Sequence, residues 1–323
     1  MTTAIEAKPE SLAIERERIT RLVRGYSMEV SSRDLQSIDD CGAVLPRGAS
    51  VYISMRPGQT YHGTVAFAAR LAHAGFNPVP HIAARNLASV EAADDYVARA
   101  VGEAGVREML VIGGDRALAA GPFDSSARLI ETGLFARHGI QRLGVAGYPE
   151  AHPRLASAAL DSALRAKREL ARRNGLALYL VTQFGFDAAP IEAWLRRIAA
   201  LNITSPLLPI RIGLAGPAGV TTLIKFAARC GIGASVRALG SHSASLARML
   251  TEAGPEPVIR KLAEIAAQPA GAAIEGCHFF AFGGAVRTAR WASSVADGQF
   301  EIPPHGEGFT VGAKANSKTP TVV

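Results

Sequence analysis

EMLVIGGD, residues 108–115, is a short apolar run that ends in two glycines and an aspartate. Four apolar side chains follow one another without alternation, which is typical of a strand buried on both faces of a parallel sheet. A parallel strand needs parallel neighbours, so the sequence on either side decides which parallel fold the chain adopts.

Seven further runs of this kind occur along the chain, at residues 26–32, 50–57, 77–84, 142–149, 176–183, 205–213 and 277–284. Segments with helical periodicity separate them, for example 63–75, 89–105, 155–175 and 191–202. Eight strand–helix units predict an α/β fold, a (β/α)8 TIM barrel. An open doubly wound sheet would need a Gly-rich phosphate turn after its first strand, and SMEVSSRD (27–34) has none.

The domain organisation follows from this pattern. We expect residues 1–25 to form an N-terminal helical extension, residues 26–302 a single barrel domain, and residues 303–323 a flexible tail, because the last segment is polar and rich in Gly and Pro.

Composition limits the classes of partner. The 323 residues carry a net charge of +7, which suits either nucleic acid or an anionic small molecule. Aromatic residues are only 6% of the chain and do not alternate with basic runs, so nucleic acid is disfavoured. There is no apolar stretch long enough to cross a membrane and no secretory signal. Cys41, Cys230 and Cys277 lie far apart and indicate reduced thiols, so we expect a cytoplasmic protein.

The active site of such a barrel lies at the carboxyl ends of its strands. Polar side chains occur at or near those ends in seven of the eight predicted strands: Glu29, Ser54, His81, Asp115, Tyr148, His152, Gln183 and Arg211. Glu29 interrupts an apolar strand, and burial raises the pKa of a carboxyl group, which suits a general acid. The histidines lack metal-ligand spacing, and the chain contains neither a GxSxG elbow nor a Walker motif.

A phosphate-binding group is a second possibility within this site. Lys167 and Arg168 follow strand five and are either solvated or, with Asp161, able to hold a phosphate and a ribose hydroxyl. From the residues alone we therefore expect a barrel enzyme that binds a large, flat, anionic ligand, with Glu29 as its acid.

The motifs resemble one family. A lone Glu in strand one, PH after strand three, GGD after strand four, YPEAHP after strand five and TQFGFD after strand six occur in that order. They are similar to the catalytic barrel of the flavin-dependent methylenetetrahydrofolate reductases, from about residue 20 to about residue 290.

The resemblance implies a role for each matching position. Glu29 matches the general acid, Asp115 the aspartate between flavin and pterin, and Gln183 a substrate-contacting glutamine, with Arg211 and Asp115 assigned to the substrate as well. It implies FAD contacts at Ser54, Met55, His81, Gly113, Gly114, Asp115, Tyr148, His152, Asp161, Lys167 and Arg168. The implied reaction interconverts 5,10-methylenetetrahydrofolate and 5-methyltetrahydrofolate through FAD, with NADH or NADPH as a possible electron donor, in a homo-oligomer.

The chain departs from the family at several positions. Met55 replaces an aromatic flavin contact and Gly113 replaces an arginine, while LAGPAGV (214–220) lacks the aromatic residue that stacks on nicotinamide or folate. Two other functions therefore stay open: a flavin-dependent oxidoreductase with a different substrate, and a non-catalytic folate- or flavin-binding protein.

Overall fold

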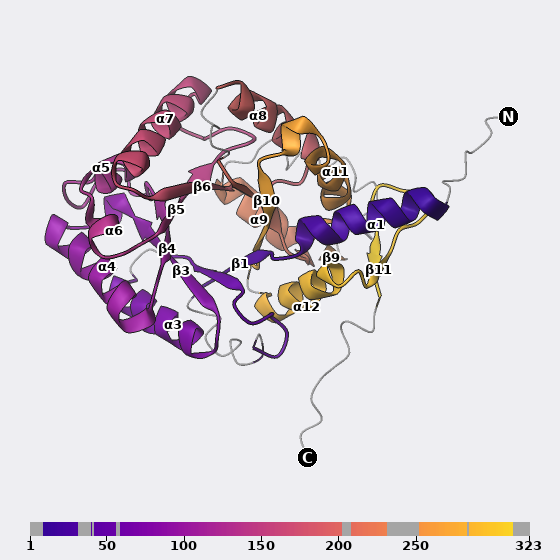
Figure 1. The fold of residues 1–323 in the computed structure, drawn as a ribbon, viewed down its shortest axis with the longest axis horizontal. Coiled ribbons are helices and arrows are strands. Elements are labelled where there is room, and N and C mark those ends of the chain that lie inside the picture. The colour runs from indigo at the N-terminus through magenta and orange to yellow at the C-terminus, as the bar shows by residue number, and fades with distance from the viewer. Residues whose placement is uncertain are drawn as a thin grey trace, which may run out of the picture.

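The computed structural model describes residues 9–31, 40, 42–55, 59–201, 208–230, 252–282 and 284–312. Within these ranges, eight parallel strands close into a barrel in the order β1–β10–β7–β6–β5–β4–β3–β2 (Figure 1). They are β1 (Ser27–Val30), β2 (Ser50–Ile53), β3 (Asn77–Ala83), β4 (Glu108–Ile112), β5 (Arg142–Gly147), β6 (Ala177–Thr182), β7 (Ile210–Ala215) and β10 (Ile274–Phe280). The predicted (β/α)8 barrel is confirmed.

Helices form a ring outside the strands (Figure 1). They are α3 (Tyr61–His73), α4 (Val90–Ala104), α5 (Ser126–Glu131), α6 (Leu134–Arg137), α7 (Ser157–Arg173), α8 (Ala188–Ala200), α9 (Val220–Cys230), α11 (Glu256–Ala266) and α12 (Ala285–Ala296), with short 3-10 turns η2 (Ala84–Asn86) and η4 (Pro269–Gly271). The helix α1 (Pro9–Val23) precedes β1 and packs against α11 and α12. Among the described residues, no helix has the length and hydropathy that a membrane crossing requires.

Local sequence explains why these helices begin and end where they do, and α4 is a clear example. The hydroxyl of Ser89 accepts a hydrogen bond from the amide of Ala92 at 3.1 Å and caps the first turn. Gly105 ends the helix in the left-handed conformation, with φ of 62°. Between these ends, Tyr96 and Val97 are buried against the barrel.

The inside of the barrel is filled by side chains rather than open. Tyr52, Val79, Leu110, Tyr179 and Val181 form a buried cluster there. The hydroxyls of Tyr52 and Tyr179 are hydrogen-bonded to each other at 2.8 Å, so their burial leaves neither one unsatisfied. This layer separates the two ends of the barrel.

An ion-pair network closes the amino end of the barrel, and it corrects the prediction for Arg211. The guanidinium of Arg211 lies 2.7 Å from the carboxylate of Glu275 and donates to the hydroxyl of Tyr52 at 3.0 Å. Arg142 bridges Glu275 and Glu108 at 3.1 and 3.4 Å. Arg211 is the second residue of β7, whereas the sequence placed this strand at 205–213 and hence Arg211 near its carboxyl end. Arg211 is therefore at the opposite end from the predicted substrate site.

The predicted flexible tail is wrong for residues 303–312. The short strands β11 (Phe300–Glu301) and β12 (Thr310–Val311) pair antiparallel, and Phe309 is buried. Arg260 donates to the carbonyls of Gly306 and Gly308 at 2.8 and 3.0 Å. An apolar anchor in an otherwise polar segment holds it against the barrel, while residues 313–323 lie outside the described ranges. A second small antiparallel pair joins β8 (Ala218–Gly219) to β9 (Glu252–Ala253).

The ion-pair network predicts a structural role for Arg211. Arg211→Met should lower the free energy of unfolding by about 2–3 kcal/mol, because it leaves Glu275 and the Tyr52 hydroxyl without their shared donor. Urea denaturation followed by circular dichroism measures this loss. Arg172→Met is the control, since Arg172 is exposed on α7 and pairs with Glu169 on its own helix, and it should change stability by less than about 0.5 kcal/mol.

The opposite result would restore the prediction from sequence. In that case Arg211→Met unfolds at the same urea concentration as the wild type and binds the substrate more weakly. That result would mean that Arg211 contacts the substrate and that the ion-pair network does not stabilise the fold.

Candidate active site

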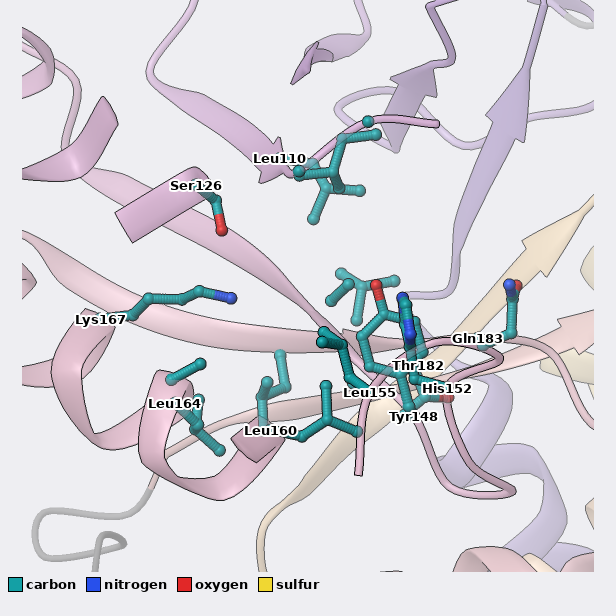
Figure 2. Close-up of a pocket in the computed structure, with 18 of the residues that line it drawn as sticks. Leu110, Ser126, Tyr148, His152, Leu155, Leu160, Leu164, Lys167, Thr182 and Gln183 are labelled. Carbon is teal, nitrogen blue, oxygen red and sulfur yellow. The ribbon is translucent and has the colours of Figure 1, made fainter. Parts of the chain in front are cut away.

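A cavity of about 810 Å³ lies at the carboxyl ends of the strands and extends between α5, α7 and α8 (Figure 2). Its volume is within the range of roughly 300–1,000 Å³ that is usual for ligand pockets. Twelve of the fourteen predicted site residues line it: Glu29, Ser54, Met55, His81, Gly113, Gly114, Asp115, Tyr148, His152, Asp161, Lys167 and Gln183. Arg168 and Arg211 do not.

Glu29 lies at the base of the cavity, on β1. Its side chain is only 19% exposed, and β1 holds it in register between Tyr52 of β2 and Phe280 of β10. Burial raises the pKa of the Glu29 carboxyl, while His81 and a hydrogen bond from Ser54 oppose that rise. A carboxyl whose pKa is raised holds its proton at higher pH and is suited to donate it.

Two buried histidines face the same oxygen of Glu29. The Nε2 atom of His81 lies 3.6 Å from Oε2, and the Nε2 atom of His278 lies 3.9 Å from it. Burial lowers the pKa of both imidazoles, that of His278 to about 3 with a further contribution from the charge of Arg211. Both rings are therefore neutral near pH 7, so Glu29 has neutral polar neighbours rather than cations.

The turn after β4 leaves its backbone open to the cavity. Gly114 has φ of 92°, and a Cβ there would meet the Cβ of Ala83 at 3.3 Å. A Cβ on Gly113 would meet no protein atom within 4 Å. Asp115 follows as an exposed carboxylate that also lines the cavity. A flat ligand can therefore approach this turn closely.

The loop YPEAHP positions Tyr148 and His152 together. Their rings are perpendicular, with centroids 4.8 Å apart. His152 Nδ1 accepts a hydrogen bond from the amide of Arg154 at 3.1 Å, which orients its ring. Ala151 has φ of 141°, a conformation that residues other than glycine rarely adopt, and such strain is concentrated at functional sites.

The outer part of the cavity is lined by charged residues of α7 and α8. Both carboxylate oxygens of Asp161 accept from Arg197 at 2.8 Å. Burial lowers the pKa of Lys167, which has no ion-pair partner among the residues that the structure describes. Figure 2 shows the amino group of Lys167 and the hydroxyl of Ser126 both pointing into the cavity. Arg168 is one residue further along α7, a rotation of about 100°, and is not among the residues that line the cavity, so its FAD contact stays a prediction.

Aromatic side chains form one wall of the cavity near Gln183. Phe280 lines the cavity, and Phe184 and Phe282 lie 5.5 and 6.0 Å from it between ring centroids. Phe226 of α9 stacks on Phe282 at 4.2 Å. Aromatic residues of β10 and α9 thus gather close to LAGPAGV, the segment in which the sequence lacks one.

Sequence reasoning missed four residues that shape the site: Ser126, Arg197, His278 and Phe280. His278 interrupts the apolar run CHFFAFGG (277–284) just as Glu29 interrupts its own strand, so the same criterion would have found it. Arg197 gave no such signal, because it belongs to an amphipathic helix in which arginines are normally solvated.

These features define what the site can do chemically. A carboxyl group with a raised pKa lies at the base, an open backbone turn beside it, and the half-buried ammonium group of Lys167 further out. No group of three or more His, Cys, Asp or Glu side chains within the described ranges is arranged to hold a metal ion. The arrangement suits proton transfer to a flat ligand together with binding of an anion.

Comparison with known proteins gives both a family and a fold. The family model described as "Methylenetetrahydrofolate reductase" matches residues 29–280. An uncharacterized protein from Clostridium thermocellum that binds two copies of 5-methyl-5,6,7,8-tetrahydrofolic acid is 14% identical; the match covers 87% of this chain and 98% of that chain, with a TM-score of 0.54. Dihydropteroate synthase from Thermus thermophilus, in complex with 6HMPPP, is 17% identical over 86% of this chain and 94% of that chain, with a TM-score of 0.47. At 14% identity, the likeness to the first of these structures shows a shared fold alone.

Because His278 is neutral in the folded protein, we expect the stability of the fold to decrease in acid. Its pKa of about 3 in the folded state lies below the ordinary value of 6.5, so the unfolded chain binds a proton that the folded chain does not. Stability should therefore fall as pH decreases from about 6.5 toward 3, by up to about 1.4 kcal/mol per pH unit from this group. Urea unfolding at pH 7, 6 and 5 measures the slope, which should be smaller in His278→Gln. Equal slopes in the two proteins would show that His278 does not titrate in this way.

Proposed function

Because the chain belongs to the methylenetetrahydrofolate reductase family, we propose that it is an FAD-dependent oxidoreductase that interconverts 5,10-methylenetetrahydrofolate and 5-methyltetrahydrofolate. Glu29 is the general acid in this proposal. The observation that carries it is the position of Glu29 at the base of the cavity, desolvated and beside neutral histidines.

The residues of the cavity fit an FAD molecule. FAD is long, flat in part and anionic at its pyrophosphate, and the cavity offers an open backbone at Gly113, a paired Tyr148 and His152, and the cation Lys167. Lys167 is half-buried, its pKa is lowered by desolvation, and it has no ion-pair partner among the described residues, so an anionic ligand would stabilise its charge. Asp161 is held in place by Arg197 and is available at the same wall for a hydroxyl group.

When bound, FAD supplies the hydride chemistry of the reaction. The protein supplies the proton: Glu29 holds it on a carboxyl oxygen and delivers it to the folate nitrogen as the bond to the one-carbon unit opens. In the reverse direction the Glu29 carboxylate takes that proton back. Gln183, after β6, and Asp115, after β4, orient the heterocycle. The proposal includes NADH or NADPH as electron donor.

The position of Glu29 favours an enzyme over a binding protein. A desolvated carboxyl group lowers the stability of the fold at neutral pH, since its raised pKa makes its charged form unfavourable. Binding of folate or flavin alone does not require an acid at this position. A reaction in which an acid donates and recovers a proton in each turnover does require a carboxyl group there.

The cation Lys167 gives a test of the FAD site with a neighbouring control. Lys167→Met should weaken FAD binding roughly ten- to a hundredfold, since it removes a charge-assisted contact to the pyrophosphate. Arg168→Met removes the same charge one residue away, outside the cavity lining, and should leave the FAD dissociation constant within about twofold. Fluorescence titration of the apoprotein with FAD measures both constants. Equal weakening would mean that the general charge of α7, rather than a contact of Lys167, attracts the ligand.

Anaerobic addition of 5-methyltetrahydrofolate to the FAD-loaded protein tests the proposed reaction. The visible flavin absorption should bleach in the wild type, and in Glu29→Gln the rate should fall roughly 10²–10⁴-fold, because the amide cannot accept the proton. Glu29→Gln should still bind FAD, which its absorption spectrum shows.

Other outcomes identify the alternatives. A flavin spectrum that does not change with any folate indicates a flavin enzyme with another substrate. Equal bleaching in wild type and Glu29→Gln removes Glu29 from the mechanism. A protein that binds folate but cannot be loaded with FAD would be a folate-binding protein and would overturn the proposal.

A further inference from the structure

Ser27, His278 and Glu29 form a buried cluster at the seam where the barrel closes. β1 pairs with β10 there, with Ser27 opposite His278 and Glu29 opposite Phe280. The hydroxyl of Ser27 lies 2.9 Å from Nδ1 of His278, and the other ring nitrogen, Nε2, lies 3.9 Å from Glu29 Oε2. Ser27 is 1% exposed and His278 is fully buried. His278 does not line the cavity, so it acts on a ligand only through Glu29.

Hydrogen-bond accounting favours one tautomer of His278. A buried serine hydroxyl has one proton that needs an acceptor. Among the described residues, the acceptor within reach of Ser27 Oγ is Nδ1 of His278. Donation from Ser27 to Nδ1 satisfies that proton, and in this arrangement Nδ1 carries a lone pair and the ring proton lies on Nε2.

The Nε2–H group of His278 then points at Glu29. In the described part of the chain it has no partner at hydrogen-bond distance, and Glu29 Oε2 at 3.9 Å is a carboxyl oxygen that it faces. The separation is longer than a hydrogen bond, and such contacts in unliganded sites shorten when the reacting state forms. A neutral donor of this kind stabilises a carboxylate more than it stabilises a protonated carboxyl.

We propose that Ser27 and His278 are a positioning pair, in which Ser27 fixes the tautomer and His278 directs an N–H at Glu29 to stabilise the carboxylate that remains after proton donation. The proposal rests on the role of Glu29 as the acid in the proposed function. It explains how a desolvated carboxyl can release its proton and regain it, since burial alone would hold the proton too firmly.

The other groups around Glu29 are consistent with a neutral donor. His81 of β3 is buried with a lowered pKa. Ser54, after β2, donates its hydroxyl proton to the carbonyl of Val30 at 3.2 Å, and its interaction with the Glu29 carboxyl lowers the pKa of that group. The ring of Tyr52 of β2 meets that of His278 edge to face at 4.5 Å. Arg211 of β7 is the nearby cation, and its charge, after burial, lowers the pKa of His278. A positively charged imidazole is therefore disfavoured, and His278 acts as an N–H dipole.

The test is a pH titration of Glu29 itself, in the unliganded protein. Infrared difference spectroscopy detects a buried protonated carboxyl, and the band that disappears in Glu29→Gln belongs to Glu29. His278→Leu removes the donor and should move the titration midpoint upward by about one pH unit, the size expected for one hydrogen bond to a charged group. His278→Gln keeps an N–H and should restore most of the midpoint. Ser27→Ala removes the hydrogen bond to Nδ1, so that the His278 ring can adopt either tautomer, and should raise the Glu29 midpoint by less than His278→Leu does.

A matched serine provides the control. Ser293 is half-buried on α12 and has no hydrogen bond to Glu29 or His278 among the described residues: its hydroxyl donates to the carbonyl of Val44 and lies 3.0 Å from the hydroxyl of Tyr26. Ser293→Ala should leave the Glu29 midpoint unchanged. Nitrogen-15 NMR of the wild-type protein gives an independent reading of the His278 tautomer, and a proton on Nε2 is expected.

Two results would overturn the proposal: a proton on Nδ1 of His278, or a Glu29 midpoint that is the same in wild type, Ser27→Ala and His278→Leu. The tautomer measurement needs no variant, so the test holds even if His278→Leu does not fold. The titration needs neither FAD nor folate. A shifted midpoint without flavin bleaching would thus refute the proposed reaction while supporting the effect of the pair on Glu29, and bleaching with an unshifted midpoint would refute the pair alone.

Discussion

The closure of the barrel between β1 and β10 is the constraint on which the rest of the structure depends. It joins residues 251 positions apart in the chain, as the contact between Ser27 and His278 shows. Once that register is fixed, Glu29 lies beside Phe280 and above the inner layer of Tyr52 and Tyr179. A shift by one residue would turn Glu29 toward the outer helices, because strand side chains alternate between faces.

Buried charged groups have different partners at the two ends of the barrel. At the amino end, Arg211 and Arg142 form ion pairs with Glu275, and Arg142 also pairs with Glu108. These pairs stabilise the fold. At the carboxyl end, the two histidines that lie within 4 Å of the Glu29 carboxyl in the described part of the chain are neutral. The filled interior of Tyr52, Val79, Leu110, Tyr179 and Val181 lies between the two ends. Stability and chemistry are thus separated along the barrel axis.

The cavity has an inner and an outer part with different properties. The inner part, at Glu29 and Gly113, lies on strand ends and is rigid because the strands are packed on both sides. The outer part is built by α7 and α8, where Asp161 is fixed by Arg197 and Lys167 is left for an anion. A ligand that spans both parts needs a flat reactive group and an anionic extension. This is the physical reason for proposing a dinucleotide such as FAD as the ligand.

The sequence by itself determined the barrel, since uninterrupted apolar runs separated by helices have few other solutions, and it determined most of the rim, because polar residues at strand ends follow from that fold. It misplaced Arg211, because an apolar run does not show where pairing begins. It also missed the anchoring of residues 303–312 by Phe309. Only the tertiary structure decided which polar groups meet. Arg197 with Asp161 and His278 with Glu29 are far apart in the chain, and a local pattern carries no information about contacts that arise from packing and strand register.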